Sequence, residues 1–288
     1  MKNNYLNLFE TYEQQYLLTT SLSNDEPFVG YTKDCTQTFY NPQYIQIGNY
    51  KWATKLLGAS SSSSHDAFIY QWGEIVGNNK TLTAGTGTTK VYNWTNTPFN
   101  DGNFDPSNSA WTKYVSSILD SEYNLTDEYD ISIRYLSGST PLKGYHYRTP
   151  TIEELADLTK HRLKLTNTIV YDMFGQKIII GDECGLGVTD EGTSGMCFSN
   201  VTVSNKSILF IPFRGSCDSD SGMWGYNTSV NLWSKTSSLV TTAINYYKSY
   251  KYAQGIFLGF IHNKLACGLA NNPRADGYCC LPILVKDK

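Results

Sequence analysis

The spacing of apolar and polar positions predicts a short helix that begins at a sharp corner of the chain. Its apolar face is formed by residues at helical spacing, namely Ile152, Leu155, Ala156 and Thr159. Thr151 and Glu154 have the spacing of a capping box, in which each side chain satisfies a backbone N–H at the helix start. Pro150 favours extended backbone in the residue before it. We therefore expect a strand that turns directly into a helix here.

Two earlier segments also predict helices. One shows apolar residues at i, i+3, i+4, i+7 and i+8, and these are Trp111, Tyr114, Val115, Ile118 and Leu119. Ser107 or Ser109 would cap that helix. Residues 127–136 predict a further short helix.

Alternating apolar and polar residues predict strands on both sides of the corner. Residues 44–54 predict a strand pair around Gly48 and Asn49. The later strand signals, separated by glycine-rich turns, fall at residues 177–180, 207–213, 231–234, 255–261 and 281–285. Residues 60–64, a run of serine, are expected to form a surface loop, and residues 77–107 to form long loops.

This order of elements, with two or three helices early and short strands later, is typical of an α+β domain with small antiparallel sheets and long loops. We assign residues 45–288 to that domain. Residues 1–44 form a separate leading segment with too few apolar residues for a core of its own. We expect this segment to attach the domain to a partner.

The charge balance of the 288-residue chain excludes some classes of partner. The net charge is -3, which favours neither nucleic acid nor an anionic membrane surface. No apolar run is long enough to span a bilayer. The first ten residues contain no sustained apolar core of a signal peptide, so we expect assembly in a cytoplasm without export.

The cysteines do not form a recognisable reactive or metal-binding set. There are seven, an odd number without a CxxC pair, which favours reduced thiols over a disulfide framework. The four histidines have no zinc-ligand spacing. Cys279 and Cys280 are the candidate nucleophiles, but they lie in a predicted strand without a neighbouring histidine, so structural thiols are favoured. We predict a protein that is not an enzyme and needs no cofactor.

Two polar loops are calcium candidates. Asp101, Asn103 and Asp105 are spaced two apart, as in the first half of a calcium loop, and Asp218 and Asp220 occupy a second loop. No glutamate completes the first loop, and these residue types are common in turns. The prediction is an ordinary turn without metal.

Aromatic richness gives the strongest indication of function. The chain has 22 Tyr, 6 Trp and 12 Phe, which suits a recognition surface but is also common in loop-rich β-proteins. Both interpretations stay open. If the chain binds a ligand through its loops, the candidate residues are Tyr92, Trp94, Trp224, Tyr226, Tyr246, Tyr247, Tyr250 and Tyr252.

Several segments resemble, in order, the Fibrobacter succinogenes major domain. They are Lys51-Trp-Ala-Thr-Lys-Leu-Leu-Gly-Ala-Ser60, Tyr70-Gln-Trp-Gly-Glu74, Tyr147-Arg-Thr-Pro-Thr-Ile-Glu-Glu-Leu155, Phe210-Ile-Pro-Phe-Arg-Gly215, Leu232-Trp-Ser234, and Arg274-Ala-Asp-Gly277 with Pro282. The resemblance covers residues 45–288 and implies a C-type-lectin-like fold. The motif positions with an implied structural role are Trp52, Trp72, Glu74, Arg148, Pro150, Thr151, Glu154, Trp233 and Arg274. Of these, the tryptophans would fill the core and the arginines would make buried hydrogen bonds near turns.

The leading segment contains Leu8-Phe-Glu-Thr-Tyr-Glu13, Pro27-Phe-Val-Gly-Tyr-Thr-Lys-Asp34 and Phe39-Tyr-Asn-Pro42. With these stretches it resembles N-terminal pieces of structural proteins from crAss-like and other Bacteroides phages. The combined resemblance implies a virion protein, which would be a head fibre, a capsid decoration or a tail-fibre module that displays the lectin-like domain. Its partners would be other virion proteins, further copies of itself and a host surface glycan or protein. The alternatives are a surface adhesin of Bacteroidota and an enzyme similar to formylglycine-generating enzymes.

Overall fold

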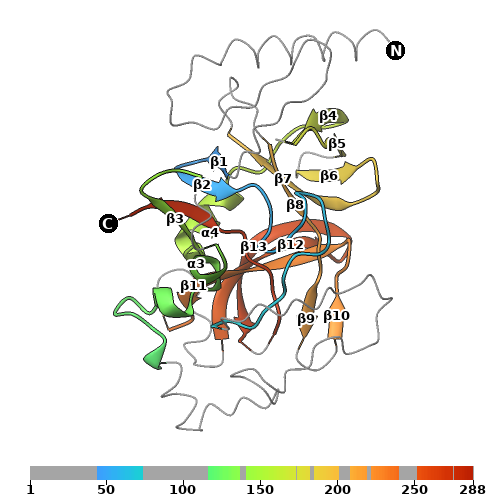
Figure 1. The fold of residues 1–288 in the computed structure, drawn as a ribbon. Helices are drawn as coiled ribbons and strands as arrows, with labels where there is room; N and C mark the ends of the chain where they lie inside the picture. The colour runs from blue at the N-terminus through green and yellow to red at the C-terminus, as the bar shows by residue number, and fades with distance from the viewer. Residues whose placement is uncertain are drawn as a thin grey trace.

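A four-stranded antiparallel sheet joins the two ends of the described chain (Figure 1). The structure, a computed structural model, describes residues 44–73, 116–136, 141–172, 174–181, 185–200, 208–218, 222–239, 252–274 and 276–287. The strands of this sheet are β1 (Tyr44–Ile47), β2 (Tyr50–Ala53), β14 (Ile283–Lys286) and β3 (Tyr145–Arg148), in the order β1-β2-β14-β3. The last strand thus pairs with both the first hairpin and the strand that precedes the corner.

The predicted corner is present, with β3 running directly into helix α4 (Ile152–Thr159). Thr151 accepts a hydrogen bond from the Glu154 backbone N–H at 3.4 Å, and the Glu154 carboxylate accepts one from the Thr151 N–H at 2.7 Å. The capping box is therefore confirmed. The buried apolar residues of the helix are Ile152, Leu155 and Leu158. Ala156 and Thr159, which we also placed on this face, are only half-buried.

A five-stranded antiparallel sheet follows the helix, with its strands side by side in chain order. They are β4 (Thr168–Tyr171), β5 (Lys177–Ile180), β6 (Leu186–Thr189), β7 (Ser194–Ser199) and β8 (Ile208–Pro212). One face covers a small apolar cluster that includes Ile178, Ile180 and Phe210. Such a meander needs only short connections between neighbouring strands.

A three-stranded sheet forms the other large β-layer, in the order β11-β12-β13. These strands are β11 (Ser229–Ser237), β12 (Tyr252–Ile261) and β13 (Lys264–Pro273). A two-residue turn, His262–Asn263, joins β12 to β13, and both residues have positive φ, at 48° and 61°. Positive φ at both central residues is the signature of a type I′ turn. A separate pair, β9 (Ser216–Asp218) and β10 (Gly222–Trp224), precedes β11.

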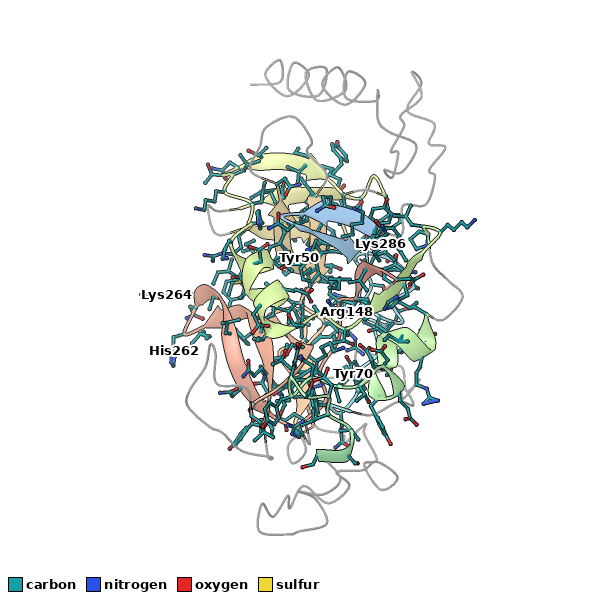
Figure 2. All side chains as sticks on the ribbon, turned by 90° about the vertical axis from the view of Figure 1, so that its left-hand side faces the viewer. Tyr50, Tyr70, Arg148, His262, Lys264 and Lys286 are labelled. Carbon is teal, nitrogen blue, oxygen red and sulfur yellow. The ribbon has the colours of Figure 1, made fainter. Side chains whose placement is uncertain are left out.

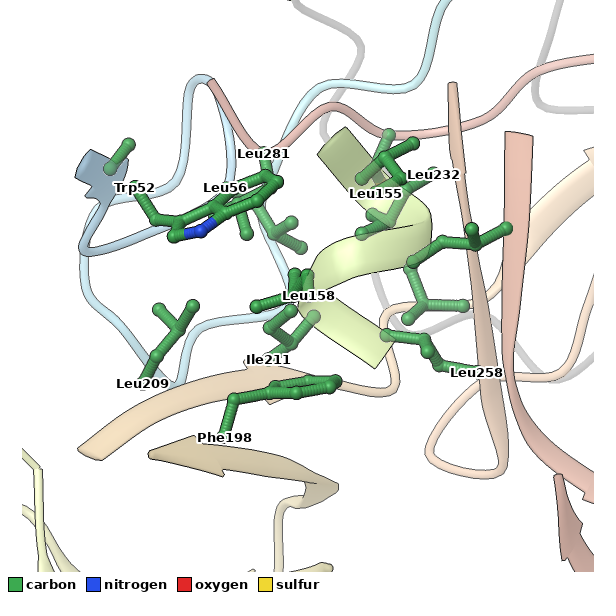
Figure 3. Close-up of a cluster of buried hydrophobic side chains, with 14 of the residues drawn as sticks. Trp52, Leu56, Leu155, Leu158, Phe198, Leu209, Ile211, Leu232, Leu258 and Leu281 are labelled. Atoms are coloured by element: carbon green, nitrogen blue, oxygen red, sulfur yellow. The ribbon is translucent and has the colours of Figure 1, made fainter. Parts of the chain in front are cut away.

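The main core lies where helix α4 meets strands from the three larger sheets (Figure 3). Leu155 and Leu158 point from the helix into this cluster. The surrounding side chains are Trp52 of the four-stranded sheet, Phe198, Leu209 and Ile211 of the five-stranded sheet, and Leu232 and Leu258 of the three-stranded sheet. Full burial of one such leucine contributes about 2 kcal/mol. The shared core holds the described sheets together.

The α+β class is confirmed, whereas the single helix predicted for residues 127–136 is corrected. A 3-10 helix, η2 (Asp127–Tyr129), and a short α-helix, α3 (Ile131–Tyr135), occupy this stretch. Asp130 separates them because its side chain accepts the Ser132 N–H and so caps α3. Among the described helices, none has the length and apolarity needed to cross a membrane.

The serine run at residues 60–64 is not wholly a surface loop, which corrects the prediction. Ser62 and Ser63 are buried, at 4% and 8% exposure. The Ser62 hydroxyl donates to the carboxylate of Asp172 at 2.5 Å, so the loop is fastened to the turn between β4 and β5. Asp172 is 110 positions from Ser62 in the sequence, so the local sequence pattern could not predict this burial.

Some predictions fall outside the described residues. They concern the leading segment, the loops at 77–107, most of the predicted helix at 111–119 and the motif residue Glu74. At the end of that predicted helix, Ser116 and Ser117 are helical and Ile118 is fully buried.

Candidate functional site

The corner residues are engaged in structural contacts. Arg148 donates to both oxygens of the Glu154 carboxylate, at 2.6 and 2.8 Å, and to the Thr149 carbonyl at 2.9 Å. The same carboxylate closes the capping box with Thr151. Pro150 is buried, and its carbonyl accepts the Lys235 N–H at 2.7 Å. A bidentate pair of this kind fixes the strand-to-helix turn and leaves few groups for a ligand.

The remaining motif residues also lie inside the protein. Trp52, Trp72 and Trp233 are each 0% exposed. The indole N–H of Trp72 donates to the Ser234 carbonyl at 2.8 Å, and that of Trp233 donates to the Tyr70 carbonyl at 2.9 Å. The guanidinium of Arg274 lies 3.9 Å from the centre of the Trp72 ring. These residues support the fold.

The candidate nucleophiles are shielded from solvent. Cys279 and Cys280 are both fully buried, and burial raises the pKa of each thiol to about 12. The Cys280 sulfur lies 3.3 Å from the Ser132 hydroxyl and 3.7 Å from the Thr149 hydroxyl. The thiolate is the reactive form of cysteine, and burial disfavours it at both positions. Cys279 and Cys280 therefore have the character of structural thiols.

We expect Cys279 and Cys280 to resist alkylation in the native protein. At pH 7.5, iodoacetamide should label both thiols at least about a hundredfold more slowly than in urea, because burial disfavours the thiolate and blocks access. Peptide mass spectrometry after timed labelling measures this. Fast labelling of either thiol in the folded state would revive the enzyme interpretation. The half-buried Cys267 serves as the internal comparison.

The described residues offer neither a metal cluster nor a roomy pocket at the positions considered. No group of three or more His, Cys, Asp or Glu side chains is placed to hold a metal there. Asp101, Asn103, Asp105 and Asp220 fall outside the described residues, and Asp218 is described only as part of β9. A crevice lined by Ile45, Asp172 and Phe210 is too narrow to hold even a water molecule. Ligand pockets typically enclose about 300–1,000 Å³, so this crevice is too small.

Among the predicted binding residues, the structure describes Trp224, Tyr226 and Tyr252. Trp224 ends β10 and Tyr252 begins β12, and both are half-buried. Tyr226 is 44% exposed, which is high for so large a side chain. The other candidates, Tyr92, Trp94, Tyr246, Tyr247 and Tyr250, lie outside the described residues. The structure therefore directs attention to Tyr226.

Tyr226 stacks on a histidine that sequence reasoning missed. The rings of Tyr226 and His65 are 4.6 Å apart at their centres and tilted by 36°. His65 directly follows the serine run at residues 60–64, and we call residues 60–66 the serine loop. Asp66 braces this loop by accepting hydrogen bonds from the Ser60 N–H at 3.0 Å and from the Ser64 hydroxyl. No local signal in the sequence links the two rings, because 161 positions separate them.

The turn that carries Tyr226 is held rigidly. Asn227 has a positive φ of 56°, a conformation that asparagine tolerates better than most residues. Its N–H donates to the Phe213 carbonyl at 2.7 Å, its side-chain oxygen accepts the Ser194 N–H at 2.6 Å, and its side-chain nitrogen donates to the Gly192 carbonyl at 3.0 Å. Tyr226 is thus presented from a preorganised turn, which lowers the entropic cost of binding.

The end of the β12–β13 hairpin lies beside this turn. The Phe260 N–H donates to the Thr228 carbonyl at 3.0 Å, and the Phe260 ring packs edge-on against Phe213. Phe260 is 37% exposed and Ile261 is 50% exposed. Figure 2 shows His262 and Lys264 at the same end of the hairpin, projecting from the molecule. Ile261, the next residue of β12, points to the opposite face of the sheet. We call His65, Tyr226 and Phe260 together the aromatic surface.

The electrostatics of this surface favour a neutral imidazole. Burial lowers the pKa of His65, and the Arg214 guanidinium lowers it further by charge repulsion. Arg214 is itself 1% exposed and donates to the Ala67 carbonyl at 3.3 Å. At neutral pH the surface therefore presents stacked, uncharged rings, which suit apolar or ring-stacking contacts.

Comparisons with protein-family models, with curated proteins and with solved structures found no match to this chain. The function must therefore be argued from the geometry of the aromatic surface and from the sequence.

Proposed function

We propose that this protein is a non-enzymatic virion component of a phage that infects Bacteroidota, and that it displays a C-type-lectin-like domain for attachment. The observation that carries the binding role is the aromatic surface: Tyr226 stays exposed on a braced turn, and Phe260 stays partly exposed beside it at the end of β12. The fully buried thiols argue for recognition over catalysis.

The lectin-like assignment rests on the ordered sequence motifs and on how they meet in space. In strand β14, Ile283 lies opposite Trp52 of β2 on one side and opposite Arg148 of β3 on the other. The corner and the Trp52 segment thus share the main core, and Trp72 and Trp233 pack together in a second apolar cluster. This packing supports a lectin-like domain displayed as a unit by the leading segment. A surface adhesin of Bacteroidota is the second candidate, because the same surface would serve it equally.

The experiment tests location and binding together. Mass spectrometry of purified particles should detect the protein, and particles carrying Tyr226→Ala should adsorb to host cells at least about tenfold more weakly, as expected for loss of an aromatic anchor. Tyr226→Phe keeps the ring and should adsorb normally. Tyr123→Ala is the matched control, since Tyr123 is 50% exposed outside the aromatic surface.

Two results would contradict the proposal. Particles that lack the protein would refute the virion role and favour the adhesin. Adsorption that is unchanged in intact Tyr226→Ala particles would refute a binding role for the aromatic surface.

A further inference from the structure

The outer edge of β13 is a long row of backbone groups that no described strand pairs with. Strands β12 and β13 pair without a break from Ile261↔Lys264 to Tyr252↔Pro273. Since β13 is the last strand in the order β11-β12-β13, its second edge is open among the described strands. The opposite edge of the sheet is covered, because the Trp233 N–H on β11 donates to the Cys279 carbonyl at 2.9 Å.

The hairpin geometry identifies the outward-facing residues. Phe260 turns its N–H away from β13, towards the Thr228 carbonyl, so Phe260 and Leu265 form a pair without mutual hydrogen bonds. Alternation along an antiparallel ladder then directs the N–H and C=O of Leu265, Cys267 and Leu269 away from β12. Within the described chain, none of these three residues has a hydrogen-bond partner for those groups.

This edge lacks the usual protection against strand addition. Natural edges are blocked by charges, prolines or bulges. Here the register with β12 has no shift, Lys264 lies at the first position and Pro273 at the last. Between them, one face carries Ala266, Gly268 and Ala270, which are small enough to permit close approach.

We propose that β13 pairs antiparallel with β13 of a second copy, about a two-fold axis at Gly268. Cys267 of one copy would then exchange hydrogen bonds with Leu269 of the other. The hydrogen bonds of this register centre on Cys267 and Leu269 of the two copies, and Pro273, which has no N–H, lies outside the pairing. The space around the axis is open, since a Cβ added at Gly268 would meet nothing within 4 Å.

A second copy fits this edge better than an arbitrary strand because the edge is complementary to itself. The side chains of Leu265, Cys267 and Leu269 pack on the core face, so pairing would continue the same apolar layer into the partner. The two Lys264 ammonium groups would lie roughly 27 Å apart, at opposite ends of the paired strands. Symmetric pairing of one patch with itself is the usual geometry of a homodimer.

The first test is the oligomeric state of the full chain. Sedimentation velocity up to about 200 µM should show a dimer, since an interface with a Kd of about 10 µM would then be mostly occupied. Cys267→Pro should give a monomer with a melting temperature close to that of the wild type, because the N–H it removes faces outward.

The second test fixes the register and does not depend on the proline variant. Gly268→Cys should form an intermolecular disulfide under mild oxidation, because facing residues of a non-hydrogen-bonded pair have Cα atoms about 4.5 Å apart. Ala270→Cys is the matched control on the same face, and it should cross-link at least about tenfold less, as its mate would lie several residues away. The wild type supplies the background from Cys267.

A wild-type chain that stays monomeric over this range would overturn the proposal. A dimer that survives Cys267→Pro and shows no preferential cross-link at Gly268→Cys would also overturn it, because another interface would then hold the copies together. Neither outcome bears on host adsorption, so failure here is distinct from failure of the proposed function.

Discussion

Trp72→Ala should lower the free energy of unfolding by about 4 kcal/mol, the cost typical of deleting a fully buried tryptophan. The ring is 0% exposed, and its N–H donates to the Ser234 carbonyl at 2.8 Å. It also covers the Arg274 guanidinium at 3.9 Å. Burial lowers the pKa of Arg274 to about 9, so the group is still charged at neutral pH inside the protein. Removal of the ring would leave that charge without its aromatic face.

Urea unfolding monitored by circular dichroism measures the loss, and a double-mutant cycle isolates the contact. Trp72→Phe keeps an aromatic face and should cost less than half as much as the alanine variant. Combined with Arg274→Met, Trp72→Ala should show a coupling of about 1–2 kcal/mol. Additive losses would mean that the stacking contributes nothing. A loss below about 1 kcal/mol for Trp72→Ala would contradict the role of this residue in the core.

The parts of the fold that could be predicted are those that local pattern specifies. The capping box at Thr151 and Glu154 needs residues only three apart, and both hydrogen bonds formed as expected. The strand at 177–180 matched β5 because a β-branched run is bounded by turn residues on both sides. The hairpin at Gly48 was visible for the same reason.

Strand β13 was missed because its sequence carries little pattern. Its small residues alternate with larger ones, and every position after Lys264 is half-buried, so neither face stands out. The turn before it, His262–Asn263, lacks the glycine that usually signals a type I′ hairpin. Pairing with β12 along the whole strand supplies the order that composition does not. Strand β7 (Ser194–Ser199) was missed for a similar reason, as it contains glycine and two serines.

The candidate site was predictable only in part. Tyr226 could be proposed because an aromatic residue stands in a glycine-rich turn, which is a common setting for recognition. His65 could not, because its contact with Tyr226 depends on the packing of the serine loop. The contribution of Phe260 likewise depends on the Thr228 hydrogen bond that brings the hairpin beside the turn.

A buried carboxylate that sequence reasoning also missed carries the second large effect. Asp130 is 0% exposed. Its oxygens accept the Ser132 N–H at 2.9 Å, the Thr149 N–H at 2.9 and 3.2 Å and the Thr149 hydroxyl at 2.7 Å. It therefore ties the start of helix α3 to the strand-to-helix corner, next to Arg148 and Pro150.

Asp130→Ala should lower the free energy of unfolding by about 3 kcal/mol. About 1 kcal/mol comes from the lost helix cap, and the rest comes from the buried Thr149 N–H and hydroxyl that lose their acceptor. Chemical denaturation of the two proteins measures the difference. Asp130→Asn keeps the size and one acceptor oxygen, so it should retain part of the stability.

Asp127→Ala is the matched control, because the side chain of Asp127 is 76% exposed and lies 3.9 Å from the Lys235 ammonium. The Lys235 side chain is only 10% exposed, but the Asp127 carboxylate is largely in solvent and the contact is long, so this variant should change stability by less than about 1 kcal/mol. Equal losses for the two alanine variants would contradict the structure at the corner. A large loss of stability for Asp130→Ala alone would show that the corner depends on the buried Asp130 carboxylate as well as on the capping box. The two are linked through Thr149, which donates to Asp130 and lies two residues before the helix cap Thr151.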